Sequence, residues 1–426
     1  MSFEFSPVKL VYGGDALGFD AGRTILTPLV LPGERAEVEE VRRQKGVVHA
    51  RPLRILQPST GRIQPHCPYF GRCGGCQYQH MPHVAQLKAK SEILRETLRR
   101  LGQVKWDGPI SVHAGPEWNY RNQAQLKIGR QADGTLALGF FAAESNTLVP
   151  IDACPILSPR LNALLAVLRV PPWIDALAQG RELDLLADDR DEKVMLTLGG
   201  SWDQQSAEAL AQKCLAELGG VATLAFAQNE KVQVFGEPRF TYRVGEFAYR
   251  VSPTAFFQSA RFMLPELVKA VTTEQSGAWA MDLYAGVGLF TLPLAQQFDQ
   301  VIAVEAHPQA AADLAANAQA AAGKKIRTIP GAASDFLRRC AQREPDLVVV
   351  DPPRAGVGVA TLKLLLALQP RRVLYVSCSP PTLARDLGFL LNHGYNLEGV
   401  DLFDCFPQTY HIESLVRLSR VTGKKP

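Results

Sequence analysis

The chain has 426 residues, of which 46% are hydrophobic and 21% are charged, a composition typical of globular proteins. It is longer than one hydrophobic core usually serves, so we expect two or three domains. It contains no apolar run of about 18 residues, which argues against a membrane-spanning helix.

The net charge is +4, but it is unevenly distributed. Residues 1–130 hold 19 Lys and Arg against 11 Asp and Glu, an excess of +8, which leaves −4 for the remainder. A basic front is typical of proteins that bind a polyanion. The N-terminal stretch MSFEFSPVKLVYGG lacks the basic and apolar regions of a signal peptide, so we expect a cytoplasmic protein. In that reducing compartment, closely spaced cysteines indicate metal binding or catalysis more often than disulfides.

Residues 1–57 read as several short β-strands. Glycines and a Pro-Gly pair mark the turns, and the apolar residues Ala36, Val38 and Val41 are spaced among polar ones. Strands this short and closely spaced predict a small β-barrel of the OB-like kind, a common nucleic-acid-binding module.

Residues 58–254 predict a central α+β domain that begins with a loop rich in proline, glycine and cysteine. The stretch 83–101 predicts a helix, because Leu94, Leu98 and Leu101 keep helical spacing while lysines and arginines take the other faces. This helix is a candidate to pack on the catalytic domain. Strand-like segments such as QAQLKIG and KVMLTLGG then mix with helix-like ones such as SAEALAQKCLAEL.

Residues 255–426 predict a doubly wound α/β domain of the Rossmann-like type. The strand-like runs are WAMDL, QVIAVE, IRTI, DLVVVD and RVLYVS. Helices are expected at 289–297, 308–321, 334–341, 360–368 and 382–392. Such alternation predicts a parallel sheet with helices on its faces, and NLEGVDLF and IESLVRLS are expected to complete it.

The start of this domain carries a nucleoside-binding pattern. In MDLYAGVGLFTLPLA, Gly286 and Gly288 let the backbone approach a ligand at a helix N-terminus. Glu305 ends the second strand, 23 residues after Asp282, where an acidic residue commonly binds a ribose diol. Position 291 is threonine, so the phosphate-binding G-x-G-x-x-G is incomplete. The pattern therefore favours S-adenosylmethionine (SAM) over a dinucleotide.

Two further motifs stand at later strand ends, with Asp351 in VVVDPPRAGV and Cys378 in YVSCSPPTLARDL. Ligands bind at the carboxyl ends of parallel strands, so both residues should face one crevice. Cys378 also precedes a predicted helix, whose dipole should lower the pKa of the thiol. We interpret Cys378 as a nucleophile and not as a small core residue. Cys405 is a rival, but no strand–helix junction presents it.

A nucleophilic thiolate in a methyltransferase indicates methylation at C5 of a pyrimidine. C5 is a poor nucleophile, and thiolate addition at C6 makes it enolate-like, so that it can attack a methyl sulfonium. A base must then remove the C5 proton before the thiol leaves. Glu413, in TYHIESLVRL at the start of a late strand, is the predicted base, and His411 an orienting residue.

At these motifs the chain resembles the RNA (uracil-5-)-methyltransferase family. AFFQ (255–258), DLYAGVGLFTLPLA, DPPRAGV, SCSPPTLARD and HIESLVRLSR stand in the family's order. The resemblance implies that Cys378 is the nucleophile, that Glu413 is the base, and that residues 1–56 form a TRAM domain. Beside Gly286, it places in the SAM pocket Gln258, Tyr284, Leu289, Glu305, Asp335 and Asp351. The residues that it implies for contact with the target base are Phe256, Gln258 and Asp351.

The family often has Asn where Leu289 stands, so only a backbone contact is expected there. RNA cytosine-5 methyltransferases place a cysteine beside the Asp-Pro of the fourth strand. The stretch DPPRAG contains none, which favours uracil.

Cys67, Cys73 and Cys76 have the spacing C-x5-C-x2-C. Zinc sites usually show two C-x2–4-C pairs, and only one is present. A compact triplet with a remote fourth cysteine is more like an iron–sulfur site. The resemblance implies that Cys154, in VPIDACPILSP, is the fourth ligand of a structural [4Fe–4S] cluster, with zinc as the alternative.

We therefore expect a monomeric, SAM-dependent enzyme that methylates uracil C5 in RNA after flipping the base into the crevice. The cluster and the barrel resemble family members that act on 23S rRNA, and the tRNA T-loop is the alternative substrate. A different class, a non-catalytic iron–sulfur RNA-binding protein, is disfavoured by the intact Cys378, Glu413 and Asp351. A DNA or small-molecule methyltransferase is disfavoured by the N-terminal barrel.

Overall fold

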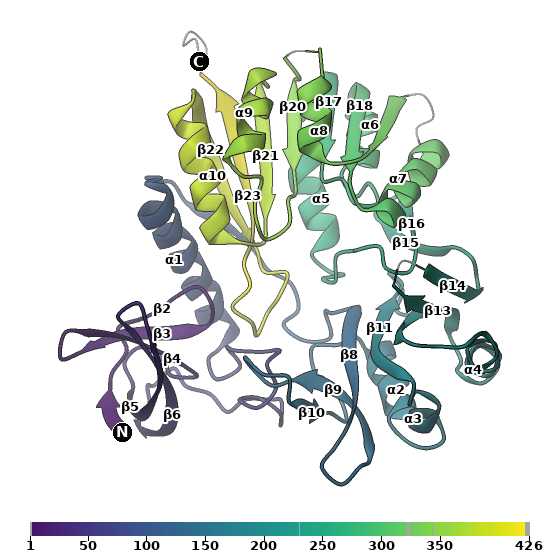
Figure 1. Ribbon diagram of the computed structural model, residues 1–426. Coiled ribbons are helices and arrows are strands. Elements are labelled where there is room, and N and C mark those ends of the chain that lie inside the picture. Colours follow the sequence, from purple (N-terminus) through teal and green to yellow (C-terminus); the bar gives the residue numbers. More distant parts are fainter. Residues whose placement is uncertain (1, 230, 322–324, 343, 422–426) are drawn as a thin grey trace.

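The computed structural model describes the whole chain except residues 1, 230, 322–324, 343 and 422–426. It contains a six-stranded N-terminal sheet, a seven-stranded central sheet and an eight-stranded C-terminal sheet. In Figure 1 the N-terminal and central sheets lie below the C-terminal one, on its left and right. Among the described residues, no helix is both long enough and apolar enough to cross a membrane.

The N-terminal sheet has the strand order β1-β5-β6-β4-β3-β2. Its strands are β1 (Ser2–Phe5), β2 (Lys9–Leu10), β3 (Asp15–Asp20), β4 (Arg23–Pro28), β5 (Arg35–Gln44) and β6 (Val47–Gln57). The two edge strands, β1 and β2, are joined by residues 6–8 alone, so the sheet must curl on itself. Ala36 and Val38 are buried in its core, whereas Val41 is 61% exposed because the pairing shifts register beside it in β5.

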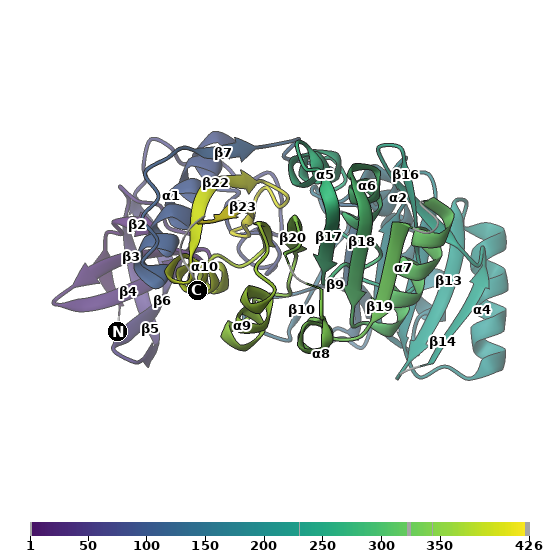
Figure 2. The ribbon, with the colours of Figure 1, turned by 90° about the horizontal axis from the view of Figure 1, so that it is seen from above.

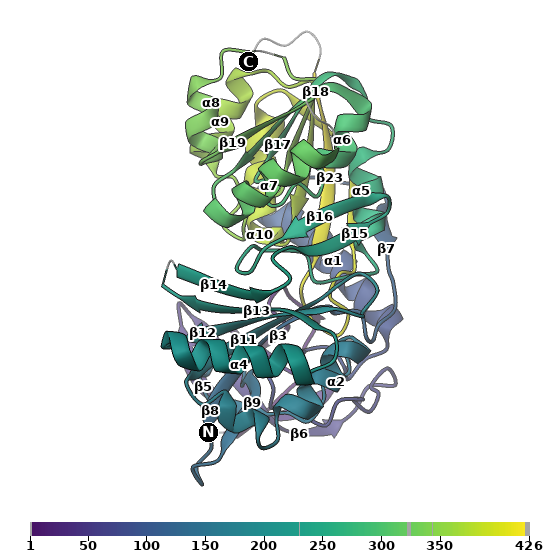
Figure 3. The same ribbon diagram turned by 90° about the vertical axis from the view of Figure 1, so that its right-hand side faces the viewer.

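The central sheet has the order β10-β9-β8-β11-β12-β13-β14. Its strands are β8 (Gln123–Arg130), β9 (Leu136–Phe141), β10 (Leu148–Pro150), β11 (Gly180–Ala187), β12 (Val194–Gly200), β13 (Val221–Gln228) and β14 (Lys231–Gly236). Helices α2 (Pro159–Leu168) and α4 (Gln204–Glu217) lie beside this sheet (Figure 3). Their Leu165 and Leu210 share one apolar core with Leu185 and Leu196 of the strands. The short helix α3 (Trp173–Ala176) belongs to the same core. A ribbon of β15 (Phe240–Val244) and β16 (Phe247–Val251) leads to the last sheet.

The C-terminal sheet has the order β19-β18-β17-β20-β21-β23-β22-β7. Its strands are β7 (Ile110–His113), β17 (Gly277–Leu283), β18 (Phe298–Glu305), β19 (Ile326–Pro330), β20 (Leu347–Val350), β21 (Arg372–Ser377), β22 (Tyr395–Phe403) and β23 (Glu413–Arg420). β17 to β21 pair in parallel, and β23 is antiparallel to both of its neighbours. All four residues of β20 are buried, as expected for a parallel strand that is covered on both faces.

Helices cover both faces of this sheet, as Figure 2 shows from above. One face is covered by α1 (His83–Gly102), α8 (Ala333–Arg339), α9 (Val359–Ala367) and α10 (Pro380–Asn392). The other is covered by α5 (Leu264–Thr272), α6 (Thr291–Gln297) and α7 (Pro308–Ala321). Within β17, Met281 faces the first group and Ala280 the second, which is the two-residue period of a strand. The predicted doubly wound architecture is confirmed.

Two features of residues 58–254 differ from the sequence prediction. β7 lies inside this range, yet it pairs with β22 and extends the C-terminal sheet. The predicted helix is present as α1, and its Leu94 and Leu98 share the core of α10. Its buried stripe is rotated, however, because Lys90 is fully buried whereas Leu101 is 61% exposed. Lys90 faces inward because the chain supplies a buried acidic partner.

Candidate active site

Strand ends of the C-terminal sheet bring together Asp351, Cys378 and Glu413. Asp351 follows β20 and Cys378 follows β21, so both stand at the carboxyl ends of neighbouring parallel strands. Glu413 opens β23, whose Ser414 pairs with Ser377, the residue before Cys378. The strand order thus joins the two predicted catalytic residues, Cys378 and Glu413, with Asp351, which is predicted to contact SAM and the target base.

The carboxyl of Glu413 is buried and not fully hydrogen-bonded by the described residues. Its side chain is 1% exposed, and its Oε1 atom has no hydrogen-bond partner among the described residues. Burial and the nearby Asp351 raise the pKa of Glu413 well above its usual range, and burial raises the pKa of Asp351 to about 7. Two neighbouring carboxyls do not both ionise readily. Once ionised, Glu413 is therefore a strong base with one oxygen free to receive the proton.

The thiol of Cys378 differs from the sequence expectation. Burial, Glu413 and Asp351 raise its pKa to about 11, and Arg354 acts in the opposite direction. The prediction that the N-terminus of α10 lowers this pKa is wrong. Desolvation and two acidic neighbours outweigh the charge of a helix N-terminus, about half an elementary charge. The resting thiol is protonated, so it must lose its proton before it can act as a nucleophile.

Asp386 of α10 holds the loop that follows Asp351. Its carboxylate accepts hydrogen bonds from the amides of Val357 (2.8 Å) and Gly358 (3.2 Å), and from the hydroxyl of Tyr375 (2.8 Å). The sequence analysis gave this residue no role. A carboxylate between leucines on the buried face of a helix is the signal that could have identified it, because such a group needs donors.

The nucleoside-binding pattern forms the turn after β17. The backbone is left-handed at Tyr284 and Gly286, with φ of 64° and 57°. The carboxylate of Glu305 accepts the amide hydrogens of Gly286 (2.8 Å) and His307 (2.6 Å), which fixes its orientation at the end of β18. Burial raises the pKa of Asp282 to about 7, and Asp351 and Glu305 add to the shift. This turn is therefore electrostatically coupled to Asp351. The fixed carboxylate and the open turn suit a nucleoside ligand such as SAM.

Two other predicted pocket residues have local partners. Leu289 is buried, and its carbonyl oxygen accepts the hydroxyl hydrogen of Tyr249 at 3.0 Å, so the expected backbone contact shares this acceptor. Asp335 lies in the first turn of α8, where its half-exposed carboxylate pairs with Arg338 at 2.6 Å. No hydrogen bond or ion pair in the described part of the chain joins it to Glu305.

Two of the three predicted base-contacting residues, Phe256 and Gln258, precede α5, and the third, Asp351, follows β20. Phe256 is 70% exposed, and Gln258 on the same segment is half-buried. An exposed aromatic ring is free to stack on a base, and a partly exposed amide can donate to one and accept from one.

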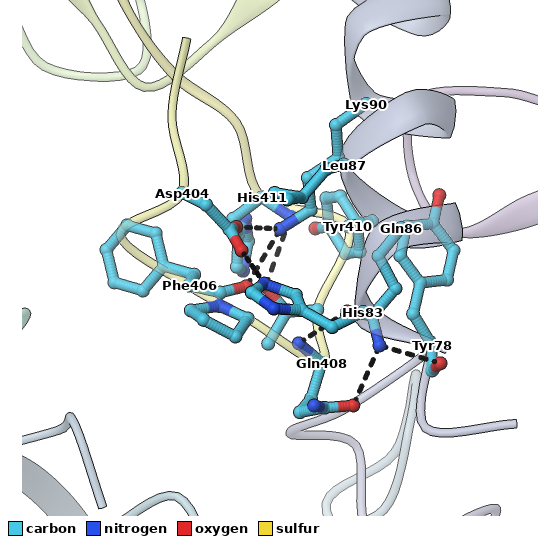
Figure 4. A network of polar contacts seen from close by, with 12 residues as sticks. Tyr78, His83, Gln86, Leu87, Lys90, Asp404, Phe406, Gln408, Tyr410 and His411 are labelled. Carbon is cyan, nitrogen blue, oxygen red and sulfur yellow. Dashed lines mark hydrogen bonds and ion pairs between the residues drawn. The ribbon is translucent and has the colours of Figure 1, made fainter. Parts of the chain in front are cut away.

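A polar network from α1 holds the loop 404–411, which joins β22 to β23 (Figure 4). The Nζ atom of Lys90 lies 2.6 Å from Asp404 Oδ1 and donates to the carbonyl of Phe406 at 2.9 Å. The Nε2 atom of His83 lies 2.7 Å from Asp404 Oδ2. Side chains of α1 therefore hold the first residues of this loop, directly after β22.

Gln408 is the second anchor of this loop, with a left-handed backbone at φ 70°. Its amide donates to Gln86 Oε1 (2.8 Å), and its side-chain oxygen accepts from Gln86 Nε2 (2.9 Å). Its backbone carbonyl accepts the amide hydrogens of Gln77 (3.0 Å) and Tyr78 (2.9 Å), which follow Cys76. The cysteine-rich loop is thus bonded directly to the loop before Glu413. The sequence analysis missed these residues, because polar side chains are by default assigned to the surface.

A separate cavity of about 250 Å³ lies beneath the cysteine-rich loop. Cys67, Cys73, Cys76 and Cys154 all line it, together with Arg121. Burial raises the pKa of Cys76 to about 12 and of Cys154 to about 11, and neighbouring thiols add to both shifts. No three side chains of the described residues converge to hold a single metal ion. The structure thus brings the remote Cys154 to the same cavity as the three clustered cysteines.

Comparison with known proteins agrees with this geometry. The family model described as tRNA (Uracil-5-)-methyltransferase matches residues 82–421. An uncharacterized RNA methyltransferase of Aquifex aeolicus is 32% identical over 420 residues, which is 96% of each chain. The 23S rRNA (uracil(1939)-C(5))-methyltransferase RlmD of Alkalilimnicola ehrlichii is 31% identical over 448 residues, covering 98% of this chain and 96% of its own.

A solved structure shares the fold. The tRNA (uracil-54, C5)-methyltransferase of Pyrococcus abyssi, in complex with S-adenosyl-L-homocysteine, matches with a TM-score of 0.74 at 22% identity. The match covers 98% of this chain and 100% of that one. From the family match and the full-length relatives, the chain belongs to the tRNA (uracil-5-)-methyltransferase family, SAM-dependent enzymes that methylate C5 of uracil in RNA.

Proposed function

We propose that this enzyme methylates uracil by covalent catalysis, with Cys378 as the nucleophile and Glu413 as the base. The observation that carries the proposal is the convergence of a thiol and a buried carboxyl with an unpartnered oxygen at one sheet edge. Methyl transfer to nitrogen needs no thiol nucleophile, because nitrogen is itself nucleophilic. When bound, SAM supplies an electrophilic methyl group and a positive charge, which favours ionised carboxylates nearby.

The chain's own residues then divide the chemistry. Cys378 loses its proton to solvent and adds to C6 of uracil, which makes C5 nucleophilic. With SAM bound, C5 would take its methyl group, and the sulfur of SAM would keep the electron pair of the broken bond and leave as S-adenosyl-L-homocysteine. C5 would then carry both the methyl and its original hydrogen. Glu413 removes that hydrogen as a proton, the electron pair re-forms the C5–C6 double bond, and the sulfur of Cys378 leaves. Arg354 favours the thiolate, since it lowers the pKa of Cys378.

For the four-cysteine cavity we propose a [4Fe–4S] cluster held by Cys67, Cys73, Cys76 and Cys154. Zinc is the alternative, because four cysteine thiolates also bind zinc. The role proposed for the cluster is structural. The cavity joins the cysteine-rich loop to Cys154, which precedes α2 of the central sheet.

For the substrate we propose 23S rRNA, bound in part by a TRAM-like N-terminal sheet. The support is the full-length similarity to proteins named as 23S rRNA methyltransferases and the net positive charge of residues 1–130. tRNA is the second candidate, because the family model and the Pyrococcus abyssi enzyme carry that name. For either substrate, the proposed enzyme acts as a monomer in the cytoplasm.

One assay separates the candidates. Anaerobically purified protein with SAM is offered unmodified 23S rRNA or unmodified tRNA, and 5-methyluridine is quantified by mass spectrometry after digestion. Product in the rRNA alone supports the proposal. Product in tRNA alone keeps the chemistry and overturns the substrate. Product in neither, from protein that binds RNA and SAM, supports the non-catalytic RNA-binding reading.

A further inference from the structure

The N-terminal sheet contributes a side chain to the catalytic edge. Tyr12 lies in the turn between β2 and β3, and its hydroxyl donates a hydrogen bond to the carbonyl oxygen of Cys378 at 3.2 Å. The two residues are 366 positions apart in the chain. Sequence analysis placed Tyr12 in the RNA-binding barrel alone.

The turn that carries Tyr12 is anchored on both sides. Lys9 of β2 forms an ion pair with Glu96 of α1, and Leu10 is buried in the core that α1 shares with α10. Gly14 has φ of 95°, and a Cβ atom there would come within 2.9 Å of the Gln77 side chain. This turn is therefore packed against α1 and the cysteine-rich loop.

The ring of Tyr12 is also fixed. It meets the ring of Tyr410 edge to face, with 5.5 Å between centroids and 89° between planes. Tyr410 belongs to the loop 404–411 that the α1 network holds. The titratable groups that influence Tyr12 are Tyr410, Arg354, Cys378 and Glu413, so its hydroxyl lies in the field of the reacting groups. Burial, together with Tyr410, Cys378 and Glu413, raises its pKa to about 12, while Arg354 opposes the shift. The phenol therefore remains a hydrogen-bond donor at neutral pH.

The acceptor is the backbone carbonyl of Cys378, which lies just beyond the end of β21 and so outside the hydrogen bonds of the sheet. Cys378 stands between the end of β21 at Ser377 and the start of α10 at Pro380. In the described part of the chain, Tyr12 is the donor that the structure records for this oxygen. The hydrogen bond fixes the peptide plane after Cys378, and with it the backbone from which the sulfur projects.

We propose that Tyr12 is a positioning residue for the nucleophile, so that the N-terminal sheet completes the active site as well as binding RNA. The inference rests on the proposed role of Cys378. Its consequence is that attack on C6 depends on how the N-terminal sheet is seated. A misplacement of about 1 Å in a reacting group can cost about 100-fold in rate.

The test compares Tyr12→Phe with Tyr395→Phe in the full chain. Tyr395, the first residue of β22, is a matched control. Its buried hydroxyl also donates to a backbone carbonyl, that of Pro370. The probe is a 5-fluorouridine RNA with SAM, on which the adduct accumulates because C5 carries no removable proton. We expect Tyr12→Phe to form the adduct about 10–100-fold more slowly, with unchanged RNA affinity and melting temperature, and Tyr395→Phe to react like the wild type.

Equal adduct rates in Tyr12→Phe and wild type overturn the inference. A parallel loss of RNA affinity and melting temperature in Tyr12→Phe also overturns it, because the residue would then be structural. If the wild type forms no adduct, the proposed function fails, and the role of Tyr12 is tested instead by the rate at which iodoacetamide alkylates Cys378. Peptide mass spectrometry measures this rate. An altered rate in Tyr12→Phe alone supports positioning, and an unaltered rate contradicts it.

Discussion

The ammonium nitrogen of Lys90 lies 2.6 Å from a carboxylate oxygen of Asp404, and both side chains are fully buried. This pair connects α1 with the residue that follows β22. Despite its burial, Asp404 has a lowered pKa, because Lys90 and His83 stabilise its charge. Desolvation lowers the pKa of Lys90, and Asp404 opposes that shift. The loop before Glu413 therefore begins at a buried ion pair, and removing either partner would leave the other charge buried and uncompensated.

Replacing Lys90 with methionine should destabilise the protein. The change leaves Asp404 buried without its lysine partner, and an uncompensated buried charge costs about 3–5 kcal/mol. Lys88→Met is the matched control, because Lys88 is 79% exposed in the same helix and pairs weakly with Glu92. We expect a control effect below about 0.5 kcal/mol in urea unfolding. Equal midpoints for the two variants would contradict the structural role of the pair.

Replacing Gln408 with glycine should slow the removal of the C5 proton. Glycine tolerates the left-handed φ of 70° but loses the side-chain bonds to Gln86 and Glu117. The loop before Glu413 loosens while Cys378 is untouched, so a covalent enzyme–RNA adduct should accumulate on ordinary uridine. Gln369→Gly, also left-handed at φ 57° but at the far end of the sheet, should not accumulate it. Denaturing gels with labelled RNA measure both, and an adduct absent from both variants would refute the role of Gln408.

Glu413→Gln should separate the two halves of the reaction. Glutamine keeps the shape of the side chain but cannot accept the proton, so turnover should fall by about 100–10,000-fold while the adduct on normal RNA persists. Cys378→Ala should form no adduct at all. Glu398→Gln, on the exposed part of β22, serves as the control. Turnover of Glu413→Gln at the wild-type rate would assign the base to another residue.

The rate of adduct formation should rise with pH. A thiol with a pKa of about 11 is ionised in only about one molecule in 10,000 at pH 7. A raised pKa means that the thiolate appears only at higher pH, so the rate should increase about tenfold per unit between about pH 6 and 9. Arg354 lowers this pKa, so Arg354→Gln should move the profile to still higher pH. Single-turnover reactions on 5-fluorouridine RNA measure both profiles, and a flat profile for the wild type would refute the raised pKa.

Cys154→Ser should prevent assembly of a complete cluster. Cys154 is distant in sequence from the other three cysteines but lines the same cavity. We expect iron and visible absorbance to fall well below the approximately four irons per chain of a [4Fe–4S] protein. Cys340→Ser, at the end of α8 and outside the cavity, should retain both. Full iron content in Cys154→Ser would show that this ligand is wrongly assigned, and zinc in the wild type would decide for the alternative metal.

The sequence predicted the C-terminal half well for a local reason. The buried strands β17, β18, β20 and β21 are short apolar runs, and each is followed by a helix with its own period. Element order could therefore be read without any long-range contact. The rule that ligands bind at the carboxyl ends of parallel strands then selected Asp351 and Cys378. Glu413 followed from the start of a late strand, although its neighbours became known only from the pairing of β21 with β23.

The features that escaped prediction depend on residues far apart in the chain. Lys90 looks like a surface residue in a helical pattern, and only Asp404, 314 positions later, explains its burial. β7 has too few residues to be identified from its pattern, and it forms a strand because the edge of β22 is available to pair. The direction of the Cys378 pKa shift was wrong because desolvation and neighbouring carboxyls are properties of the packed site.

By itself the sequence determined the order of strands and helices in the C-terminal domain, the nucleoside-binding turn, and the residue types required for C5 chemistry, because each is encoded in a short stretch. The tertiary structure alone decided which of these residues meet, how they ionise, and that Tyr12 of the first sheet reaches Cys378. Burial and contacts between segments hundreds of residues apart set those properties, and neither leaves a periodic signal in the chain.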